Sequence, residues 1–241
     1  MEEFLVGEEA SFHVLLDGKT ILPLDTAQDH KRVGDDDTGL NTGGMGTFSP
    51  SPYVTESIRH EAMERILIPT LRGLEKRGIS YKGVLYAGLM MTSHGTKLLE
   101  YNVRFGDPET QSLMVRMEDD LVDVIEATLA GKLSGRSLRW KSGSSVCVVM
   151  AAHGYPGEVR TSDNNNIIDG LDRAASVPET VVFHAGTKKV DGKVVTSGGR
   201  VLGVTASGSS MRQAQERAYD ACEKIYWKGV HYRKDIGGKR A

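Results

Sequence analysis

The stretch Glu100-Tyr101-Asn102-Val103-Arg104 decides how this 241-residue chain is interpreted, because it joins strand-forming residues to groups that can hold a metal and a phosphate. Residues two apart in a β-strand face the same side. The alternation therefore predicts Glu100, Asn102 and Arg104 on one face of a strand. The intervening apolar side chains, through Phe105, are predicted on the other face.

Such a row of polar groups suits a magnesium–nucleotide complex. Carboxylate and carboxamide oxygens are hard ligands that Mg²⁺ accepts, and Mg²⁺ takes few protein ligands beside phosphate and water oxygens. An arginine at the end of the row can neutralise charge on a transferring phosphoryl group. The alternative is a polar strand face with a surface ion pair, and for these three residues alone it is slightly favoured.

The surrounding sequence predicts strands and helices in mixed order. Phe12, Val14 and Leu16 alternate with polar residues, and Asp17-Gly18 is typical of a hairpin turn. The strands are predicted at 10–16, 20–24, 84–91, 96–103, 146–152, 181–184 and 201–206. The helices are predicted at 56–76, 118–129 and 210–226.

Three details of this interpretation can be checked. Thr55 is expected to cap the first helix, and Pro69 to kink it or end it. In the second helix, the apolar stripe Leu121, Val122, Ile125 and Leu129 is expected to face the core. The polar segment 135–145 reads as a linker. The chain is therefore expected to be α+β, with one domain at 1–136 and a second at 137–241.

Composition excludes some classes of function without identifying a reaction. The net charge of −2 gives no broad field for nucleic acid, and no apolar run approaches the roughly 18 residues needed to span a membrane. Cys147 and Cys222 are far apart, with no metal or redox spacing. We expect a reduced, cytoplasmic protein with no nucleic-acid or membrane partner. His13, His94, His153 and His184 lack partners at ligand spacing and are interpreted as structural.

The residues that begin at Arg104, at the end of the predicted strand, resemble the signature of a known protein family. Arg104-Phe105-Gly106-Asp107-Pro108-Glu109-Thr110-Gln111 matches the signature of phosphoribosylamine–glycine ligases position by position. Similarity extends over nearly the whole chain, including the segments 2–11, 28–35, 41–46, 154–157, 184–187, 198–202 and 233–237. The resemblance implies the C-terminal half of an ATP-grasp domain, followed by a small mixed α/β C-terminal domain.

The same resemblance implies roles for the first group of residues. Glu100 and Asn102 would be ligands of Mg²⁺ (or Mn²⁺), and Arg104 would act catalytically on the transferred phosphate. The preceding strand-forming stretch 86–90 contains no further metal carboxylate, which leaves the number of metal ions open.

Binding of ATP is assigned by resemblance to the start of the chain. Glu2, Phe4 and Leu5 would lie at a hinge that reads the adenine edge, and Glu9 would hold the ribose hydroxyls. From the residues alone, an ordinary solvated start of a strand is the preferred interpretation of Glu9.

A second group is predicted to bind the other substrates. Asp29, His30 and Lys31 precede a glycine-rich loop that includes Gly43 and Gly44, whose backbone N–H groups could approach an anion. Lys31 adds a positive charge and is assigned a catalytic role. The alternative is a wide turn with no ligand.

The turn after Arg104 is predicted to hold an amine. Asp107 and Glu109 could receive an ammonium group or position an amine nucleophile, and Pro108 would stiffen the turn. A purely structural turn is the alternative, and both interpretations are compatible.

The resemblance implies that ATP, glycine and 5-phosphoribosylamine give ADP, phosphate and glycinamide ribonucleotide through glycyl phosphate. The family's N-terminal domain and first ATP-grasp subdomain have no counterpart here, so we expect this chain alone to be inactive or nearly so, and a missing N-terminal half to be its partner. Two alternatives stay open: another ATP-grasp carboxylate–amine ligase, or a non-enzymatic remnant.

Overall fold

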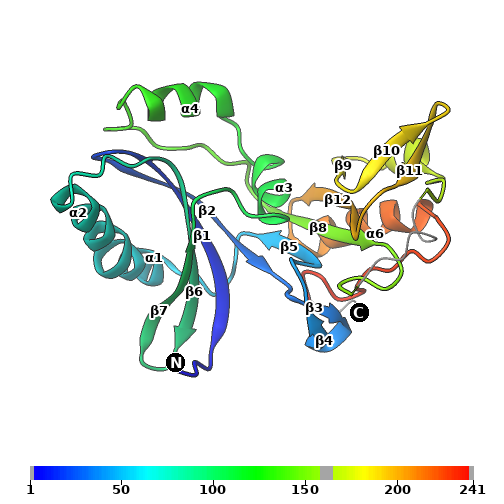
Figure 1. The fold of residues 1–241 in the computed structure, drawn as a ribbon, viewed down its shortest axis with the longest axis horizontal. Helices are drawn as coiled ribbons and strands as arrows, with labels where there is room; N and C mark the ends of the chain where they lie inside the picture. The colour runs from blue at the N-terminus through cyan, green and yellow to red at the C-terminus, as the bar shows by residue number, and fades with distance from the viewer. Residues whose placement is uncertain (1–2, 158–164, 239–241) are drawn as a thin grey trace. The chain divides into compact units, whose positions relative to one another are not determined.

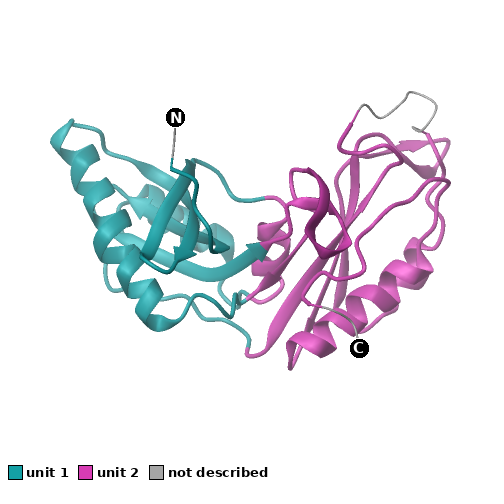
Figure 2. Cartoon of the chain, turned by 90° about the horizontal axis from the view of Figure 1, so that it is seen from below, with its two compact units in different colours: residues 1–28, 50–106, 117–141 teal, residues 29–49, 107–116, 142–241 magenta. Residues whose placement is uncertain are grey.

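The computed structural model describes residues 3–157 and 165–238. The chain forms two compact units, each built from three segments (Figures 1 and 2). Unit 1 comprises residues 1–28, 50–106 and 117–141, and unit 2 comprises residues 29–49, 107–116 and 142–241. The linear division after residue 136 stays a prediction, and the α+β class is confirmed.

Unit 1 contains an antiparallel sheet in the order β7-β6-β1-β2. Its strands are β1 (Glu8–Asp17), β2 (Ile21–Asp29), β6 (Lys82–Thr92) and β7 (Gly95–Asn102). The predicted hairpin at Asp17-Gly18 is present: Asp17 Oδ1 accepts from the N–H groups of Lys19 and Thr20, and Gly18 has φ +97°. The left-handed conformation favours glycine at that position.

One face of this sheet packs against a helical segment. The segment consists of α1 (Glu56–Ala62), a π-helical turn (Met63–Leu67) and α2 (Ile68–Lys76). Thr55 caps α1 by accepting from the Ile58 N–H at 3.3 Å, as predicted. Pro69 lies in the first turn of α2, where a missing N–H is tolerated. The core between helices and sheet contains Phe12, Val14, Leu16, Ala62, Leu67, Leu71, Leu85, Ala87 and Leu89.

Helix α4 (Leu121–Leu129) corrects one prediction. The expected core stripe is largely exposed, at 61% for Val122, 38% for Ile125 and 60% for Leu129. The helix instead buries Val124, Ala127 and Thr128. Helix α4 contacts β1 and β6, so its buried stripe is offset from the stripe that the apolar periodicity indicated.

Unit 2 contains a second antiparallel ladder in the order β5-β8-β12-β9. Its strands are β5 (Gly46–Ser49), β8 (Ser144–Ala151), β9 (Thr180–His184) and β12 (Arg200–Gly208). Helix α6 (Met211–Lys224) packs on β8 and β12, and α5 (Leu171–Ala175) contacts α6. The core includes Val146, Val148, Met150, Val204, Ala218, Tyr219 and Trp227. Cys147 and Cys222 are buried, and neither forms a disulfide.

Several short elements of unit 2 were not predicted. They are β5 and α5, β3 (Arg32–Gly34), a 3₁₀ turn (Asp35–Asp37), β4 (Thr38–Asn41), α3 (Glu109–Met114), β10 (Thr187–Val190) and β11 (Lys193–Thr196). Each is too short or too polar to give a period that can be read from the sequence.

A buried arginine fastens the C-terminal segment to the first of these elements. Arg233 is 1% exposed and forms two charged contacts of 2.7–2.8 Å with Asp235. It also donates to Asp37 Oδ1 at 2.7 Å and to the carbonyl of Arg32 at 3.1 Å. These contacts fix the β3–β4 segment that follows Lys31.

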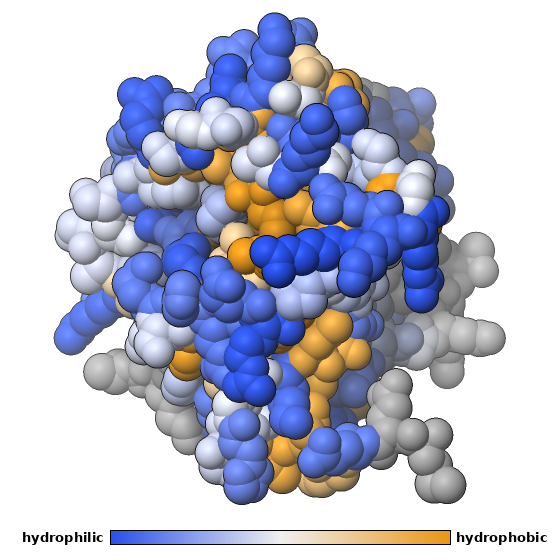
Figure 3. All heavy atoms as spheres, turned by 90° about the vertical axis from the view of Figure 1, so that its left-hand side faces the viewer, coloured by the Kyte–Doolittle hydropathy of each residue, from blue (hydrophilic) through white to orange (hydrophobic). Residues whose placement is uncertain are grey.

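Some apolar surface stays exposed among charged side chains (Figure 3). In unit 1 the most exposed large apolar residues are Phe4, Val6 and Val103, at 90%, 75% and 72%. Within residues 3–157 and 165–238, no helix is long and apolar enough to cross a membrane.

Candidate functional site

Strand β7 has the predicted pair of side chains, Glu100 and Asn102, on one face. Asn102 Nδ2 donates to Glu100 Oε1 at 2.9 Å, so the carboxylate and the carboxamide lie side by side on β7. Tyr101, between them, points to the opposite face and reaches the helices, where its hydroxyl lies 2.7 Å from Thr70 Oγ1. The alternation expected at Glu100 and Asn102 is therefore present.

The strands beside β7 leave room on this face. Gly88 of β6 is paired with Glu100, and a Cβ built on Gly88 would lie 3.3 Å from Glu100 Cγ. The glycine therefore lets the Glu100 side chain lie across the neighbouring strand. Ser11 of β1 follows in the same row, since it pairs with Gly88.

The second row on this face is aromatic. Asn102 pairs with Tyr86, and Tyr86 pairs with His13. The rings of His13 and Tyr86 are stacked with centroids 4.4 Å apart, and the Tyr86 hydroxyl lies 2.9 Å from Ser11 Oγ. His13 is fully buried and its Nε2 accepts from the Gly106 N–H at 3.1 Å. His13 is therefore packed within unit 1, and its structural role stays a prediction.

The end of the metal strand differs from the prediction. Strand β7 ends at Asn102, and a register shift lies between the pairings of Gly88 and Leu89. Phe105 stacks on His13, with centroids 6.4 Å apart, so it belongs to the Glu100 face and not to the face of Tyr101. A bend at residues 103–104 breaks the alternation. Arg104 is exposed and donates to the carbonyl of Phe105 at 2.9 Å.

The predicted nucleotide residues are only partly organised. Glu9 is exposed on β1 and alternates with Ser11 and His13, which places it on the same sheet face as Glu100. Phe4 and Leu5 precede β1 outside any regular element. Glu2 lies outside the described residues. The ATP-binding roles of all four stay predictions.

Unit 2 contains the second predicted group, centred on an ion pair. Lys31 Nζ lies 2.8 Å from Asp29 Oδ2. The Asp29 side chain is 1% exposed, whereas that of Lys31 is 39% exposed. A buried carboxylate therefore holds a cation that solvent, and hence a ligand, can reach.

The surroundings of Asp29 change its acidity. Burial, and then repulsion from Glu109, raise the pKa of Asp29 from 3.8 to about 7, although Lys31 and Arg200 act in the opposite direction. Glu109 is 2% exposed, so both carboxylates are shielded from water. A buried acid with a strongly raised pKa, next to a second buried acid and two cations, is typical of a functional site, although structural ion pairs can produce the same shift.

The glycine-rich loop does not present the free N–H groups expected of an anion cradle. The Gly43 N–H donates to the Tyr155 hydroxyl at 3.0 Å, and the Gly44 N–H donates to Thr42 Oγ1 at 2.9 Å. The Met45 N–H donates to the carbonyl of His30 at 2.9 Å. Contact with an anion would therefore come from the Lys31 side chain, and the substrate-binding roles of Gly43 and Gly44 stay predictions.

Gly44 has a structural reason to be glycine. Its φ is +117°, and a Cβ would lie 2.6 Å from Pro108 Cδ and 2.7 Å from Asp29 Oδ1. The loop therefore passes directly against the buried carboxylate and the following turn. Any side chain would push these groups apart.

His30 is engaged within unit 2. Its Nε2 accepts from the Gly237 N–H at 3.4 Å, its Nδ1 lies 3.8 Å from Asp37 Oδ1, and its ring lies against Phe48. Burial and the nearby Arg233 charge lower the pKa of His30. These contacts favour a structural role, and its predicted contact with substrate stays untested.

The turn at residues 107–109 packs on β5. The Thr47 hydroxyl donates to the carbonyl of Pro108 at 3.0 Å. The Asp107 side chain is 54% exposed, and its Oδ1 accepts from Gln111 at 3.2 Å. Asp107 is therefore the accessible acid of this turn, whereas Glu109 is buried at the start of α3.

Sequence reasoning assigned no role to two residues that join these parts. Arg200, at the start of β12, donates from NH1 to the carbonyls of Gly43 and Asp107 at 2.8 and 2.7 Å, and its NH2 lies 3.3 Å from Asp107 Oδ2. Tyr155 accepts from Gly43. The only signal for them was their presence in the shared segments 154–157 and 198–202.

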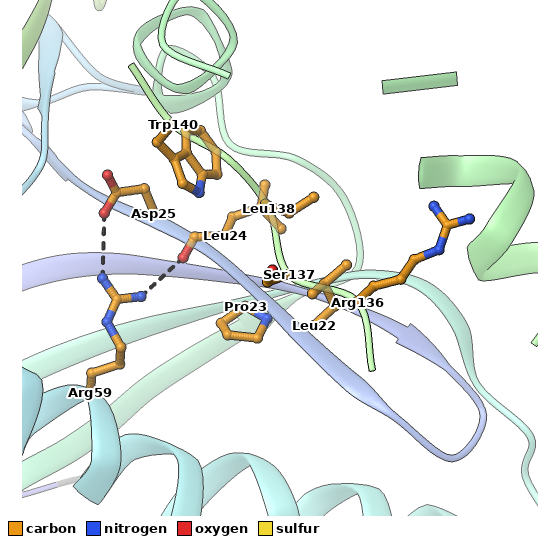
Figure 4. Close-up of a pocket in the computed structure, with 9 residues that line it drawn as sticks. All are labelled: Leu22, Pro23, Leu24, Asp25, Arg59, Arg136, Ser137, Leu138 and Trp140. Atoms are coloured by element: carbon orange, nitrogen blue, oxygen red, sulfur yellow. Dashed lines mark hydrogen bonds and ion pairs between the residues drawn. The ribbon is translucent and has the colours of Figure 1, made fainter. Parts of the chain in front are cut away.

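A cavity of about 330 Å³ in unit 1 contains none of the predicted residues. It is lined by Leu22, Pro23, Leu24, Asp25, Arg59, Arg136, Ser137, Leu138 and Trp140 (Figure 4). Arg59 donates to the Leu24 carbonyl at 3.2 Å and lies 3.4 Å from Asp25 Oδ1, while Arg136 points away from them. The Arg59 guanidinium is therefore engaged by the Leu24 carbonyl and the Asp25 carboxylate.

Two protein-family models match the chain. Residues 1–110 match "Phosphoribosylglycinamide synthetase, ATP-grasp (A) domain", and residues 145–239 match "Phosphoribosylglycinamide synthetase, C domain". Within the described part of the chain, the first match contains the metal strand and the second contains Tyr155 and Arg200.

Curated proteins that are similar to this chain are named phosphoribosylamine–glycine ligase. Phosphoribosylamine–glycine ligases from Escherichia coli O157:H7 and Brucella melitensis biotype 1 are 53% and 50% identical over 239 and 237 residues. Each alignment covers 98% of this chain and 55% of the relative. The chain spans about half the length of the curated relatives it matches.

Solved structures agree with the fold. A phosphoribosylamine–glycine ligase from Thermotoga maritima superposes with a TM-score of 0.85 at 35% identity, covering 97% of this chain and 56% of that one. The biotin carboxylase subunit of pyruvate carboxylase gives a TM-score of 0.65 at 15% identity, covering 96% of this chain and 48% of that one, and so supports the fold alone.

The fold, together with the match of residues 1–110 to an ATP-grasp domain, defines the ATP-grasp class. ATP-grasp proteins use ATP and a divalent metal ion. Within this class, the chain belongs to the phosphoribosylglycinamide synthetase family. The resemblance inferred from the sequence is confirmed.

Proposed function

We propose that this chain carries the metal–phosphate face and the amine-substrate group of a phosphoribosylamine–glycine ligase. The reaction would join glycine to 5-phosphoribosylamine at the expense of ATP and give glycinamide ribonucleotide, ADP and phosphate. The observation that carries the proposal is the Glu100–Asn102 pair on one face of β7, with Glu100 exposed, in a chain 50–53% identical to ligases of that name over 98% of its length.

The donor set of unit 1 fits Mg²⁺ or Mn²⁺. Among the described residues no three His, Cys, Asp or Glu side chains converge, so Glu100 supplies the single carboxylate and Asn102 a neutral oxygen. Few protein ligands suit a metal ion whose other ligands are phosphate oxygens and water. When bound, the ion would neutralise charge on the ATP phosphates.

The remaining residues of unit 1 would position the nucleotide. Glu9, on the same sheet face, would accept hydrogen bonds from the ribose hydroxyls, and Phe4 and Leu5 would contact the adenine. Arg104, exposed beyond the strand end, would donate to the phosphoryl oxygens as charge builds on them. Its current contact is a single backbone carbonyl, which a phosphate can replace.

The chemistry has two displacement steps. A carboxylate oxygen of glycine bonds to the γ-phosphorus of ATP while the β–γ bridging bond breaks, which gives glycyl phosphate and ADP. The phosphoribosylamine nitrogen then bonds to the carbonyl carbon, the C–O bond to phosphate breaks, and the nitrogen releases one proton. Activation turns a poor leaving group into a good one, so positioning and charge neutralisation supply most of the catalysis.

Unit 2 would hold the other substrates. Lys31 would contact an anionic group of a substrate, while Asp29 beneath it fixes the Nζ. Asp107, as the accessible carboxylate of its turn, would accept hydrogen bonds from an ammonium or amine group.

The test is ADP release by the 241-residue chain with glycine and phosphoribosylamine, alone and after addition of the half of the E. coli relative that the alignment leaves unmatched. Glycinamide ribonucleotide should be identified by mass spectrometry. Turnover should require both co-substrates and should be lost in Glu100→Gln. Faster turnover with a different acid or amine, or ADP release that ignores phosphoribosylamine, would contradict the proposal.

The assay also decides whether the chain is active alone. We predict that its activity alone is low. Unchanged turnover on adding the second half would show that the chain is sufficient. The control is Glu75→Gln, an exposed carboxylate on α2 that should leave turnover unchanged.

A further inference from the structure

We propose that Tyr155 and Arg200 are positioning residues that clamp Gly43 and Asp107, and so set the shape of the substrate group in unit 2. The proposal rests on the proposed function for the identity of the substrates. The clamp itself rests on contacts within unit 2 and can be tested without any reaction.

Gly43 is held at both of its backbone groups. Its N–H donates to the Tyr155 hydroxyl at 3.0 Å, and its carbonyl accepts from Arg200 NH1 at 2.8 Å. The two clamping residues are 112 and 157 positions away in sequence. A loop glycine that bonds through both groups to distant side chains loses the freedom that glycine otherwise has.

The same guanidinium joins the loop to the turn. Arg200 NH1 donates to the Asp107 carbonyl at 2.7 Å, and NH2 lies 3.3 Å from Asp107 Oδ2. The Arg200 side chain is 23% exposed, so these contacts are only partly screened by water. A lysine could replace one of these bonds but not the fork, because it lacks the planar set of donors.

The clamp is packed as well as hydrogen-bonded. A Cβ built on Gly199 would lie 2.5 Å from Tyr155 Cδ2, so the ring rests on the backbone just before Arg200. A Cβ on Gly43 would lie 3.3 Å from the Arg200 Cζ and 3.4 Å from the Tyr155 hydroxyl. Tyr155, Gly199 and Arg200 therefore act as one block against Gly43.

The clamp also affects the neighbouring charged residues. Gly44 passes against Asp29 and Pro108, so a change at Gly43 would move the backbone that covers Asp29. Asp29 in turn holds Lys31. The clamp would therefore fix the accessible carboxylate of Asp107 and the cation of Lys31 on one rigid frame, which a charged amine substrate requires.

The primary experiment is hydrogen exchange of the Gly43 amide by NMR in the ¹⁵N-labelled chain. Tyr155→Phe removes only the acceptor oxygen, so Gly43 exchange should rise about fivefold, which corresponds to one net hydrogen bond. Arg200→Gln should raise it as well, and Arg200→Lys should give an intermediate value. Tyr226→Phe and Arg212→Gln, at exposed positions, should leave it unchanged.

The second readout is the affinity of ribose 5-phosphate, a stable sugar phosphate. Tyr155→Phe and Arg200→Gln should both weaken its binding, and the double variant should be less than additive because both residues hold Gly43. Unchanged Gly43 exchange in both single variants would overturn the clamp. Faster exchange with unchanged affinity would overturn its positioning role.

Failure of the proposed function would look different. If the unaltered chain showed no affinity for ribose 5-phosphate or glycine, the substrate assignment would fall. The Gly43 exchange rates would still decide whether Tyr155 and Arg200 hold the loop. Urea unfolding of each variant separates a local effect from general destabilisation.

Discussion

Lys31 Nζ lies 2.8 Å from Asp29 Oδ2, and the carboxylate of this pair is almost completely buried while the ammonium is not. The buried Asp29 carboxylate thus holds the exposed Lys31 ammonium in place. It also places an acid whose pKa is about 7 under a predicted substrate contact, so the pair gives unit 2 a pH dependence that can be measured.

The first prediction concerns stability against pH. Burial and Glu109 raise the pKa of Asp29 above the unfolded value of 3.8, so the folded protein keeps a proton that the unfolded chain releases. This contribution is fully present below about pH 4 and is lost as the pH rises through about 7. Relative to Asp29→Asn, the unaltered chain should lose stability between pH 4 and 8, by at most about 1.4 kcal/mol per pH unit.

Urea unfolding at several pH values measures this difference. The matched control is Asp172→Asn, which replaces an exposed acid of α5 in the same unit. A constant difference between the chain and Asp29→Asn over this range would show that Asp29 titrates normally.

The second prediction concerns two glycines. Gly44→Ala should destabilise unit 2 by about 2–4 kcal/mol, because φ is +117° and the Cβ would meet Pro108 and Asp29 at 2.6–2.7 Å. Gly73→Ala in α2 should stabilise by about 0.5–1 kcal/mol, because nothing lies within 4 Å of its Cβ and alanine favours helix. Thermal unfolding measures both, and a tolerated alanine at residue 44 would contradict the packing around Asp29.

The third prediction concerns Arg233. Arg233→Met should destabilise the chain by roughly 3 kcal/mol, because it leaves Asp37 and Asp235 without the cation that joins them. The matched surface pair, Arg212 with Glu216, should contribute within about 0.5 kcal/mol when Arg212→Met is made. Equal effects in the two variants would mean that the C-terminal segment is not fastened by Arg233.

The sequence predicted those parts of the fold that depend on local pattern. The hairpin at Asp17-Gly18, the cap at Thr55 and the shared face of Glu100 and Asn102 all follow from short-range rules, and all are present. The α4 stripe failed because periodicity marks an apolar face without saying what will cover it. The stripe that is buried, Val124, Ala127 and Thr128, depends on contacts of α4 with β1 and β6, which no local pattern reports.

The candidate site was predictable to a smaller extent for a related reason. The metal pair lies within three consecutive residues, so alternation was sufficient. Tyr155 and Arg200 contact Gly43 from more than 100 positions away, and no local pattern reports such a contact. The glycine-rich loop misled in one respect, since its N–H groups at Gly43 and Gly44 are already hydrogen-bonded.

The last prediction concerns the metal pair. Glu100→Gln should weaken Mn²⁺-dependent binding of ATP by about tenfold or more, because it removes the negative charge from the only two ligands that β7 offers. Asn102→Ala should weaken it as well, since the amide oxygen is lost and Glu100 loses its 2.9 Å hydrogen bond. Calorimetry with Mn²⁺, and again with EDTA, separates the part of the ATP affinity that depends on the metal ion from the part due to nucleotide contacts.

Two further comparisons make that result specific. Glu75→Gln changes the net charge equally on an exposed helix and should leave Mn²⁺–ATP affinity unchanged. Without metal, Glu100→Gln should bind ATP at least as well as the unaltered chain, because a carboxylate facing phosphate repels it. If Glu100→Gln weakened ATP binding equally with and without Mn²⁺, the residue would contact the nucleotide or support the sheet, and the metal assignment of β7 would be wrong.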